Sequence, residues 1–435
     1  MTTTSRRLVM FFVALYIAIA GLLVLRVPLG KAPDETAHIY YVQHLATTHS
    51  LPVFKPIGAT KDPGYEFHQP PLYYAISAVG WNAVGPGVQN YACRLVSLLF
   101  GAATILLVFG AVRRLFDESA AILAAGFVAL WPLHINVGAS AGNDTAAGFF
   151  CALLFYLVAR GSTEEAPSLK LSAAIGVAVG LAMLSKTSTL TVCLAALGWL
   201  VHSSWKSPVE IDRTLRRTIF LRNAAIALTV ASLICGPWLV RNTALYGDPL
   251  AVRIFDEAFR NSSPRPSAFF AGGIDFLTYI RALFLVMFCT AWGIFGGPNT
   301  ALEVLNLFGT RGPRPEAFGA LPFLLVCGGA TLAALLGLRR VAWDELNSSH
   351  KRAWLWWLLG LLAVVAAWAN FNLIQFQGQA RYLHPALLPL AAVLALGWRE
   401  IFPMETARGK TGTIGFALVL VGLSVWNIVS WRTLV

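Results

Sequence analysis

Long runs of hydrophobic residues alternate with shorter polar segments along the whole chain. About eleven of these runs are long and apolar enough to predict membrane-spanning helices. Their approximate bounds are Leu8–Leu29, Leu95–Val112, Ala120–Val137, Thr145–Val158, Leu171–Leu184, Leu190–Val201, Ala224–Val240, Leu321–Leu338, Trp354–Ala369, Ala386–Trp398 and Ile414–Val429. The pattern therefore predicts an all-α polytopic membrane protein, built as a bundle of about 11 transmembrane helices.

Two of the segments between these runs are much longer than the others. They predict a first outer loop at about 30–94 and a second outer loop at about 241–320. Both are rich in aromatic residues and proline rather than in serine and glutamate, so we expect ordered structure in them. The helical pattern of Glu35–Thr48 predicts that the first loop carries juxtamembrane helices. We expect one integral membrane domain over 1–435, with no separate soluble domain.

The composition supports a membrane protein. Hydrophobic residues make up 57% of the chain and charged residues only 12%, whereas soluble domains carry roughly 25% charge. The formal net charge is +12, a balance that is also typical of nucleic-acid-binding proteins. Here, however, the basic residues lie at the ends of the predicted spans and not on one face. We therefore expect membrane lipids as partners, and no nucleic acid.

The basic residues also predict how the chain crosses the membrane. Those in the shorter loops share one side, and they include Arg6, Arg7, Arg113, Arg114, Arg216, Arg340, Arg399 and Arg408. The positive-inside rule assigns that side to the cytoplasm. We expect a multi-pass membrane protein with a cytoplasmic N-terminus. Phe276–Phe295 is also apolar enough to span, but it would then flip every later basic loop, so we expect it to lie in the outer interface.

Ionisable residues gather where the first outer loop begins. Asp34 and Glu35 are adjacent carboxylates, and His38 follows within the predicted helix. Asp34 stands after a proline and before the helical pattern, which is typical of an N-cap; this role does not exclude a catalytic one. Glu35 and His38 are three residues apart and share a helix face. Together with His68 they are candidate ligands for one divalent cation.

His68 and Gln69 stand directly before two prolines. Each proline fixes its own backbone angle and favours an extended residue before it, so the segment is a rigid entry into a helix. Two interpretations follow. The segment is a structural corner, or it directs the side chains of His68 and Gln69 at a sugar or a phosphate.

Further polar residues mark the outer ends of later spans. Asp144 opens the fourth predicted span, where it caps the helix, supports Asp34 or binds a ligand. Lys186 stands at an outer turn and Arg241 at the outer end of a span. For Lys186 and Arg381, a snorkelling side chain is the alternative to ligand binding. Arg381 has unusually many Asn and Gln neighbours, and arginine clamps phosphate through a planar pair of donors.

These residues are far apart in the sequence, yet all lie at the outer ends of spans. We therefore expect Asp34, His68, Asp144 and Arg381 to line one cavity at the outer membrane boundary. Ionisable groups held at a membrane are costly and are usually functional.

Three motifs carry a resemblance to a known family. They are the carboxylate pair after the first span, the His-Gln-Pro-Pro-Leu corner at 68–72, and the Arg-Tyr-x-x-Pro sequence at 381–385. With the layout of the spans over most of the chain, they resemble the GT-C superfamily of integral membrane glycosyltransferases. Protein O-mannosyltransferases, the lipid A aminoarabinose transferase and mycobacterial arabinosyltransferases belong to it. Many members also carry a soluble domain, which is not evident here.

The resemblance implies a GT-C-like bundle in the bacterial inner (plasma) membrane and a role in the cell envelope. It implies transfer of a sugar from a polyprenyl-phosphate donor to a hydroxyl of a lipid, glycan or protein acceptor at the outer face. Asp34 or Glu35 would be the catalytic base, and at most one divalent cation would be needed. The residues expected to bind substrate are His38, His68, Gln69, Asp144, Lys186, Arg241, Arg381 and Tyr382. A transporter or flippase of a lipid-linked sugar, or a non-catalytic envelope-assembly subunit, is the alternative.

Overall fold

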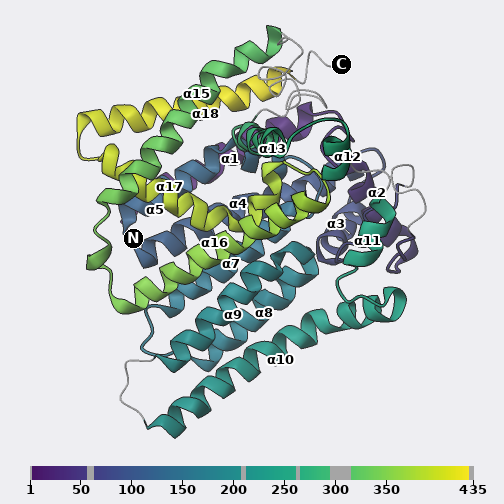
Figure 1. Cartoon of the computed structure of the whole chain (residues 1–435), viewed down its shortest axis with the longest axis horizontal. Coiled ribbons are helices and arrows are strands. Elements are labelled where there is room, and N and C mark those ends of the chain that lie inside the picture. Colours follow the sequence, from purple (N-terminus) through teal and green to yellow (C-terminus); the bar gives the residue numbers. More distant parts are fainter. Residues whose placement is uncertain (1, 56–62, 207–211, 261–264, 294–314, 431–435) are drawn as a thin grey trace.

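A computed structural model of the protein describes residues 2–55, 63–206, 212–260, 265–293 and 315–430, and throughout these ranges the regular structure is helical, with no strand. Figure 1 shows most of the long helices lying side by side across the molecule. The α-helices are α1 (Thr3–Arg26), α2 (Glu35–Thr48), α3 (Leu72–Ala83), α4 (Gln89–Leu115), α5 (Glu118–Leu130), α6 (Pro132–Gly138), α7 (Asp144–Gly161), α8 (Leu169–Ser185), α9 (Leu190–Trp205), α10 (Arg213–Tyr246), α11 (Val252–Phe259), α12 (Pro266–Ala271), α13 (Phe276–Ala291), α15 (Pro315–Gly337), α16 (Ser348–Ile374), α17 (Leu387–Ile401) and α18 (Ala407–Ser430). A 3₁₀ helix, η4 (Ala380–Ala386), leads directly into α17.

Every predicted hydrophobic run falls on one of these helices, except Ala120–Val137, which is divided between α5 and α6. Within the described ranges, 7 helices are long and apolar enough to cross a membrane, and the number is 8 if α5 and α6 are taken as one span. The chain bends by 56° between α5 and α6, where Pro132 begins the second helix. Helices α8 and α13 are apolar but shorter. The all-helical polytopic class is thus confirmed, while the number of about 11 spans stays a prediction.

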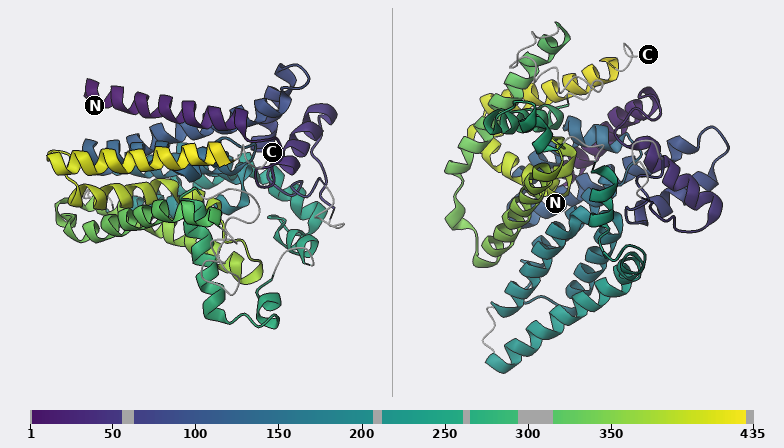
Figure 2. Two further views of the ribbon diagram at one scale, coloured as in Figure 1. Left: turned by 90° about the horizontal axis from the view of Figure 1, so that it is seen from above. Right: turned by 45° about the vertical axis from the view of Figure 1, so that its right-hand side comes forward.

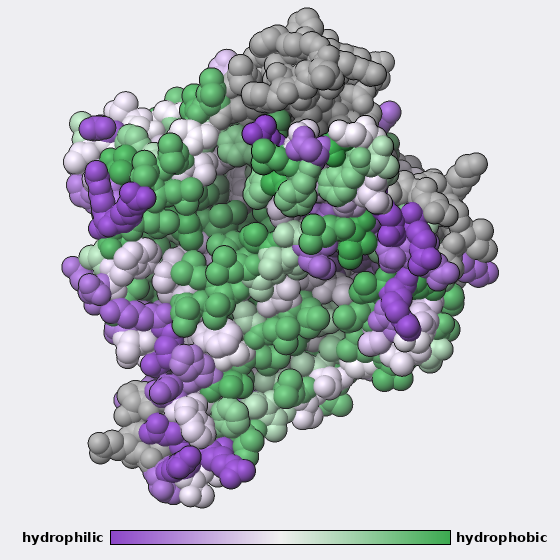
Figure 3. Space-filling model, viewed as in Figure 1, coloured by the Kyte–Doolittle hydropathy of each residue, from purple (hydrophilic) through white to green (hydrophobic). Residues whose placement is uncertain are grey.

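The surface has the polarity of a membrane protein. In Figure 3 a hydrophobic band crosses the middle of the visible face, and polar residues gather at its left and right edges. Exposed leucines, such as Leu233 of α10 and Leu362 of α16, contribute to the apolar surface. So much exposed apolar area is a liability in water but is favourable in a bilayer.

Close helix contacts hold the bundle together where side chains are smallest. Gly176 and Gly180 of α8 face α10, and a Cβ atom at Gly176 would stand 2.6 Å from the Ala227 carbonyl oxygen. Only glycine permits this separation. Small residues at such contacts let helix backbones approach each other, which supplies much of the packing in a membrane bundle.

Most polar residues at helix starts bind their own helix. Side-chain oxygens cap the first turns of α1, α5, α8, α10, α13 and α16; the capping residues are Thr2, Asp117, Ser168, Asp212, Asp275 and Asn347. Each such bond satisfies a backbone N–H group that the helix itself leaves free. Asp34, which also stands directly before a helix, makes no such capping bond.

The first outer loop contains the two predicted juxtamembrane helices. α2 begins and ends at the predicted residues, and α3 follows the Pro-Pro corner. The two helices pack through stacked rings of Tyr41 and Tyr74, 3.9 Å between centroids. Tyr73 ties α3 to the bundle, since its hydroxyl group lies 2.9 Å from the Ser97 Oγ of α4.

The second predicted outer loop is only partly described. It contains α11, α12 and α13, while 294–314 lie outside the described residues. The apolar segment Phe276–Phe295, predicted to lie in the outer interface, forms α13 up to Ala291. Its last two residues lie outside the described residues.

Several helix ends occupy one side of the bundle. The backbone N–H of Thr2 donates to the Glu118 carboxylate at 3.0 Å, and Arg399 pairs with Asp117. The N-terminus, the α4–α5 turn and the end of α17 therefore lie together. In the left view of Figure 2, the N-terminus and the helices of the first outer loop are at opposite ends of the molecule.

This grouping gives a testable topology. We expect single cysteines that replace Arg340 and Arg408 to be shielded from a membrane-impermeant thiol reagent in intact cells. A cysteine that replaces Ser50, after α2, should react. Permeabilised cells serve as the control, in which all three positions should be labelled. Labelling of the Arg340 position in intact cells would contradict the topology.

Candidate active site

Four chain segments meet at the end of the bundle that carries α2 and α3. They are the start of α2, the start of α7, the end of α8 and η4, which supply Asp34, Asp144, Lys186 and Arg381 respectively. These four residues are called the charged cluster below.

Asp34 precedes α2, but the capping role expected from the sequence is wrong. Its backbone is left-handed, with φ of 61°, and its side chain makes no capping hydrogen bond. Left-handed backbone is uncommon outside glycine and is often found where a side chain must be aimed at a site. The carboxylate of Asp34 instead forms an ion pair with Arg381.

The charged cluster is continuous. Arg381 also faces Asp144, with 3.7 Å between Nη1 and Oδ2. Lys186 Nζ is 2.5 Å from the other oxygen of Asp144. The N-cap residue of α7 is Asn143, and it makes no side-chain capping bond. Of the four residues predicted to line one cavity, Asp34, Asp144 and Arg381 are joined by ion pairs, together with Lys186. The fourth, His68, makes no ion pair with them and binds Tyr65 and Gln69.

The cluster is largely shielded from solvent. The side chains of Asp144, Lys186 and Arg381 are 9%, 14% and 13% exposed, whereas that of Asp34 is 31% exposed. The ring of Tyr382 lies beneath both cations, 5.2 Å from the Arg381 guanidinium and 5.8 Å from Lys186 Nζ. Its hydroxyl group donates to Gln377 at 3.3 Å. Asp34 and Asp144 balance the charges of the two cations, so an anion that binds Arg381 or Lys186 has to compete with these carboxylates.

Asp34 has a second partner from the first outer loop. The Tyr65 hydroxyl donates to Asp34 Oδ1 at 3.0 Å. Burial by itself raises the pKa of Asp34. The charge of Arg381 and the hydrogen bonds from Arg381 and Tyr65 lower the pKa by more, so the net pKa is well below its usual value. Asp34 is therefore a carboxylate at neutral pH.

His38 lies beside the charged cluster as a neutral side chain. Its Nδ1 is 2.8 Å from the Tyr74 hydroxyl, and the two rings stack. Burial lowers the pKa of His38 to about 4, which leaves the imidazole uncharged at neutral pH.

Glu35 is placed differently from its neighbour. It is fully buried and forms a two-bond ion pair with Arg94, each bond 2.7 Å long. Its oxygens also accept from the backbone N–H groups of Gly30 and Ala141, at 2.8 and 3.0 Å. A carboxylate with four donors and no exposure is poorly placed to take a proton from a substrate. Asp34 is accordingly the better placed of the two candidate bases.

The predicted metal ligands do not form a metal site. The structure brings no three His, Cys, Asp or Glu side chains into a metal-binding group within the described residues. Glu35 is occupied by Arg94, and both ring nitrogens of His68 have protein partners. Glu35, His38 and His68 therefore do not share a metal site in this structure.

His68 and Gln69 form the corner that precedes α3. His68 Nδ1 lies 2.9 Å from the Tyr65 carbonyl oxygen and Nε2 lies 3.2 Å from Gln69 Nε2. Asn143 donates to Gln69 Oε1 at 3.2 Å. The corner is thereby tied to the residue directly before Asp144.

Arg241 is not part of the charged cluster. Its guanidinium donates to the Pro52 carbonyl oxygen at 2.6 Å and stacks on Trp238. In the structure it anchors the segment after α2 to the end of α10. Its predicted contact with substrate stays a prediction.

Three residues that shape the site were not among the predicted site residues. Arg94 neutralises Glu35, and Tyr65 binds Asp34. Glu66 is buried, and its Oε2 has no partner among the described residues. Arg94 could have been identified from the sequence, because a charged residue at the start of an apolar run is usually functional or paired. No local pattern identifies the partners of Tyr65 or Glu66.

Glu66 leads to a prediction about pH. Burial, and then the charge of Asp34, raise the pKa of Glu66 from 4.5 to about 8. Between these pH values the folded protein holds a proton that the unfolded chain has lost, so this group makes stability fall as the pH rises. Glu66→Gln has no such proton. We expect thermal unfolding in detergent to show the variant gaining stability relative to wild type from pH 5 to pH 8. Parallel profiles would contradict this assignment.

The chain is similar to one protein family and to several solved structures. Residues 68–235 match the family model of dolichyl-phosphate-mannose-protein mannosyltransferase. No curated protein sequence matches the chain. The apo oligosaccharyltransferase of Archaeoglobus fulgidus has a TM-score of 0.55 at 14% identity, over 98% of this chain and 55% of that one.

Two further structures are similar. The same organism's oligosaccharyltransferase in complex with Zn and sulfate has a TM-score of 0.54 at 14% identity, over 96% of this chain and 53% of that one. The third is the archaeal oligosaccharyltransferase AglB from Archaeoglobus fulgidus in complex with an inhibitory peptide and a dolichol-phosphate. Its TM-score is 0.51 at 15% identity, over 97% of this chain and 56% of that one. This chain spans about half the length of these proteins.

The family model covers the part of the chain that contains His68, Gln69, Asp144 and Lys186. The structural matches extend the common fold over nearly all of the chain. The resemblance to the GT-C superfamily of membrane glycosyltransferases is confirmed by this family-model match and by this fold.

Proposed function

We propose that this protein is a GT-C-type glycosyltransferase that moves a sugar from a polyprenyl-phosphate donor to an acceptor hydroxyl at the outer face of the membrane. The similar AglB structure contains a dolichol-phosphate, and the matching family model is named for a dolichyl-phosphate-mannose donor. Both support a lipid phosphate as the leaving group. The proposed acceptor is a hydroxyl of a lipid, glycan or protein.

The charged cluster is the observation that carries this proposal. It places a partly exposed carboxylate, Asp34, beside two shielded cations, Arg381 and Lys186. Transfer from an activated sugar needs these two functions. A base must take the proton of the acceptor hydroxyl, and cations must stabilise charge on the departing phosphate.

The reaction follows from this arrangement. Asp34 accepts the acceptor proton as the acceptor oxygen bonds to the anomeric carbon. The bond between that carbon and the phosphate oxygen breaks, and the phosphate leaves with its electron pair beside Arg381 and Lys186. A single displacement of this kind inverts the anomeric carbon, as the family resemblance implies.

The ion pair with Arg381 connects donor binding to the base. In the structure, Arg381 holds the pKa of Asp34 well below its usual value, which makes it a weak base. A donor phosphate that engages Arg381 draws the guanidinium away from Asp34. The pKa of Asp34 then rises toward the range in which a carboxylate accepts a proton more readily.

Arg381 gives the direct test of the phosphate site. We expect Arg381→Ala to weaken donor binding at least about tenfold, because a charge-assisted hydrogen bond contributes roughly 1.5–3 kcal/mol. Arg381→Lys should retain only part of the wild-type donor affinity, since a point charge does not replace a planar pair of donors. Binding of a polyprenyl-phosphate sugar in nanodiscs measures both.

The matched control is Arg408→Ala, an exposed arginine at the start of α18. It removes the same charge away from the charged cluster and should leave donor binding unchanged. Wild-type binding in Arg381→Ala would contradict the phosphate site. Movement of the intact lipid-linked sugar across the membrane, without transfer to an acceptor, would favour the transporter alternative.

A further inference from the structure

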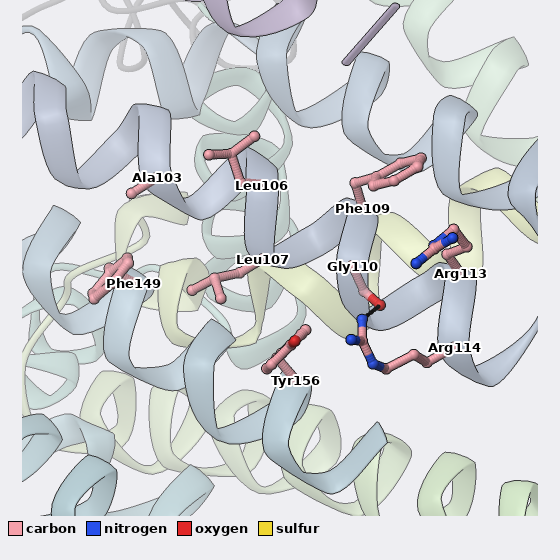
Figure 4. A pocket seen from close by; sticks show the side chains of 9 residues that line it. All are labelled: Ala103, Leu106, Leu107, Phe109, Gly110, Arg113, Arg114, Phe149 and Tyr156. Atoms are coloured by element: carbon pink, nitrogen blue, oxygen red, sulfur yellow. Dashed lines mark hydrogen bonds between the residues drawn. The ribbon is translucent and has the colours of Figure 1, made fainter. Parts of the chain in front are cut away.

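A hollow lies between α4 and α7, far from the charged cluster. Its volume is about 470 Å³, and Figure 4 shows it from close by. The residues that line it are Ala103, Leu106, Leu107, Phe109, Gly110, Arg113, Arg114, Phe149 and Tyr156. None of them carries a negative charge, whereas two carry a guanidinium group.

The two arginines stand together at one end of an otherwise apolar lining, as Figure 4 shows. Arg114 donates to the Gly110 carbonyl oxygen at 2.9 Å and lies over the Tyr156 ring, 4.7 Å from its centroid. Arg113 lies near the Phe109 ring, and its Nε is buried with no hydrogen-bond partner among the described residues. A buried donor without a partner is costly. An anionic oxygen would satisfy it.

The hollow lies at the opposite membrane boundary from the charged cluster. Arg94, which binds Glu35 next to Asp34, and Arg113 are 19 residues apart on the one helix α4. At a rise of 1.5 Å per residue they are separated by about 28 Å along the helix axis, close to the thickness of the hydrocarbon core. An anion held by Arg113 is therefore far from the proposed donor phosphate.

An apolar stripe leads along α4 to these arginines. Leu95, Leu99 and Leu106 are all exposed, and their spacing places them on one face of the helix with Arg113. The stripe crosses the hydrocarbon region and ends at a pair of positive charges. An acyl chain lying on the stripe and a phosphate at its end match this distribution of polarity.

We infer that this hollow binds an anionic glycerophospholipid of the leaflet opposite the charged cluster. The phosphate is held by Arg113 and Arg114, and an acyl chain packs against Leu106, Leu107 and Phe149. Arg113 and Arg114 suit this headgroup because a guanidinium binds phosphate oxygens through paired donors. A zwitterionic lipid presents a cation as well and is bound less well at a site that offers only positive charge.

Native mass spectrometry of the full chain in detergent tests this inference. The probes are phosphatidylglycerol and phosphatidylcholine with identical acyl chains, added at equal concentration. We expect wild type to retain one phosphatidylglycerol in preference. Arg113→Gln with Arg114→Gln should lower that affinity at least about tenfold, because two charge-assisted contacts are lost.

The chain offers a matched control in Arg339 and Arg340. These are also tandem arginines at the end of a helix, both exposed, and neither lines the hollow. Arg339→Gln with Arg340→Gln removes the same charge and should bind phosphatidylglycerol as wild type does. An equal loss in both double variants, or no preference for phosphatidylglycerol in wild type, would overturn the inference.

A third variant tests the apolar part and does not depend on the arginines. Ala103→Phe fills the hollow while leaving both guanidinium groups in place, and it should reduce retention of phosphatidylglycerol. Unchanged retention would show that no acyl chain occupies the hollow. Undecaprenyl phosphate is the competing occupant. If wild type retains it in preference to phosphatidylglycerol and the Arg113→Gln, Arg114→Gln variant loses that preference, the assignment to a phospholipid is wrong.

Discussion

Asp34→Asn is expected to lower the rate of sugar transfer by roughly 10²–10⁴-fold, the usual effect of losing a general base. Asparagine has nearly the same size as aspartate and also tolerates the left-handed backbone found at this position. The substitution therefore removes the proton acceptor while leaving the shape of the loop. Transfer from a polyprenyl-phosphate sugar, measured under single-turnover conditions, reports the chemical step directly.

Donor binding should respond differently from the rate. In wild type the Asp34 carboxylate is paired with Arg381, so it competes with the donor phosphate for the same guanidinium. Asp34→Asn removes that competitor, and we expect donor binding to be retained or strengthened. A loss of rate together with intact binding separates a catalytic residue from one that only shapes the site.

Asp275→Asn is the matched control. Asp275 is another aspartate directly before a helix, but its carboxylate caps α13 by accepting from the Thr278 N–H at 3.0 Å. Asparagine caps about as well as aspartate, so this variant should transfer sugar at the wild-type rate. Wild-type turnover in Asp34→Asn, with a confirmed substrate, would exclude Asp34 as the base.

Much of the fold could be predicted because helices in a membrane are specified locally. Apolar runs fix where the long helices lie, and each run that we identified is helical in the structure. The bounds of α2 also follow from local sequence, since Pro33 and the helical pattern after it mark its start. Figure 1 shows these helices in one bundle, but their order around it is decided by packing that no local pattern records.

The site could be predicted only as a set of helix ends. Asp34 and Arg381 are 347 residues apart, and only their common position at outer helix ends indicates that they meet. What each carboxylate binds is a property of the assembled bundle. Asp34 and Glu35 are adjacent and chemically alike, yet one faces the charged cluster and the other is fully buried against Arg94.

Glu35→Ala is expected to destabilise the protein by roughly 3–5 kcal/mol, the usual effect of leaving one charge of a buried pair without its partner. Arg94 also donates to the carbonyl oxygens of Val24 and Val27 at 2.8 and 2.7 Å. The pair therefore ties the end of α1 and the start of α2 to α4. Thermal or denaturant unfolding in detergent measures the loss, and Glu405→Ala, at an exposed position, should change stability by less than about 0.5 kcal/mol.

A double-mutant cycle separates this structural role from catalysis. Replacing both members, as in Glu35→Leu with Arg94→Met, removes the unpaired charge and should recover part of the stability that either single variant loses. The recovered protein, assayed below its unfolding temperature, should still transfer sugar because Asp34 is intact. If the double variant is stable but transfers no sugar, while donor binding persists, Glu35 takes part in the chemistry. The division of roles between the two adjacent carboxylates would then be wrong.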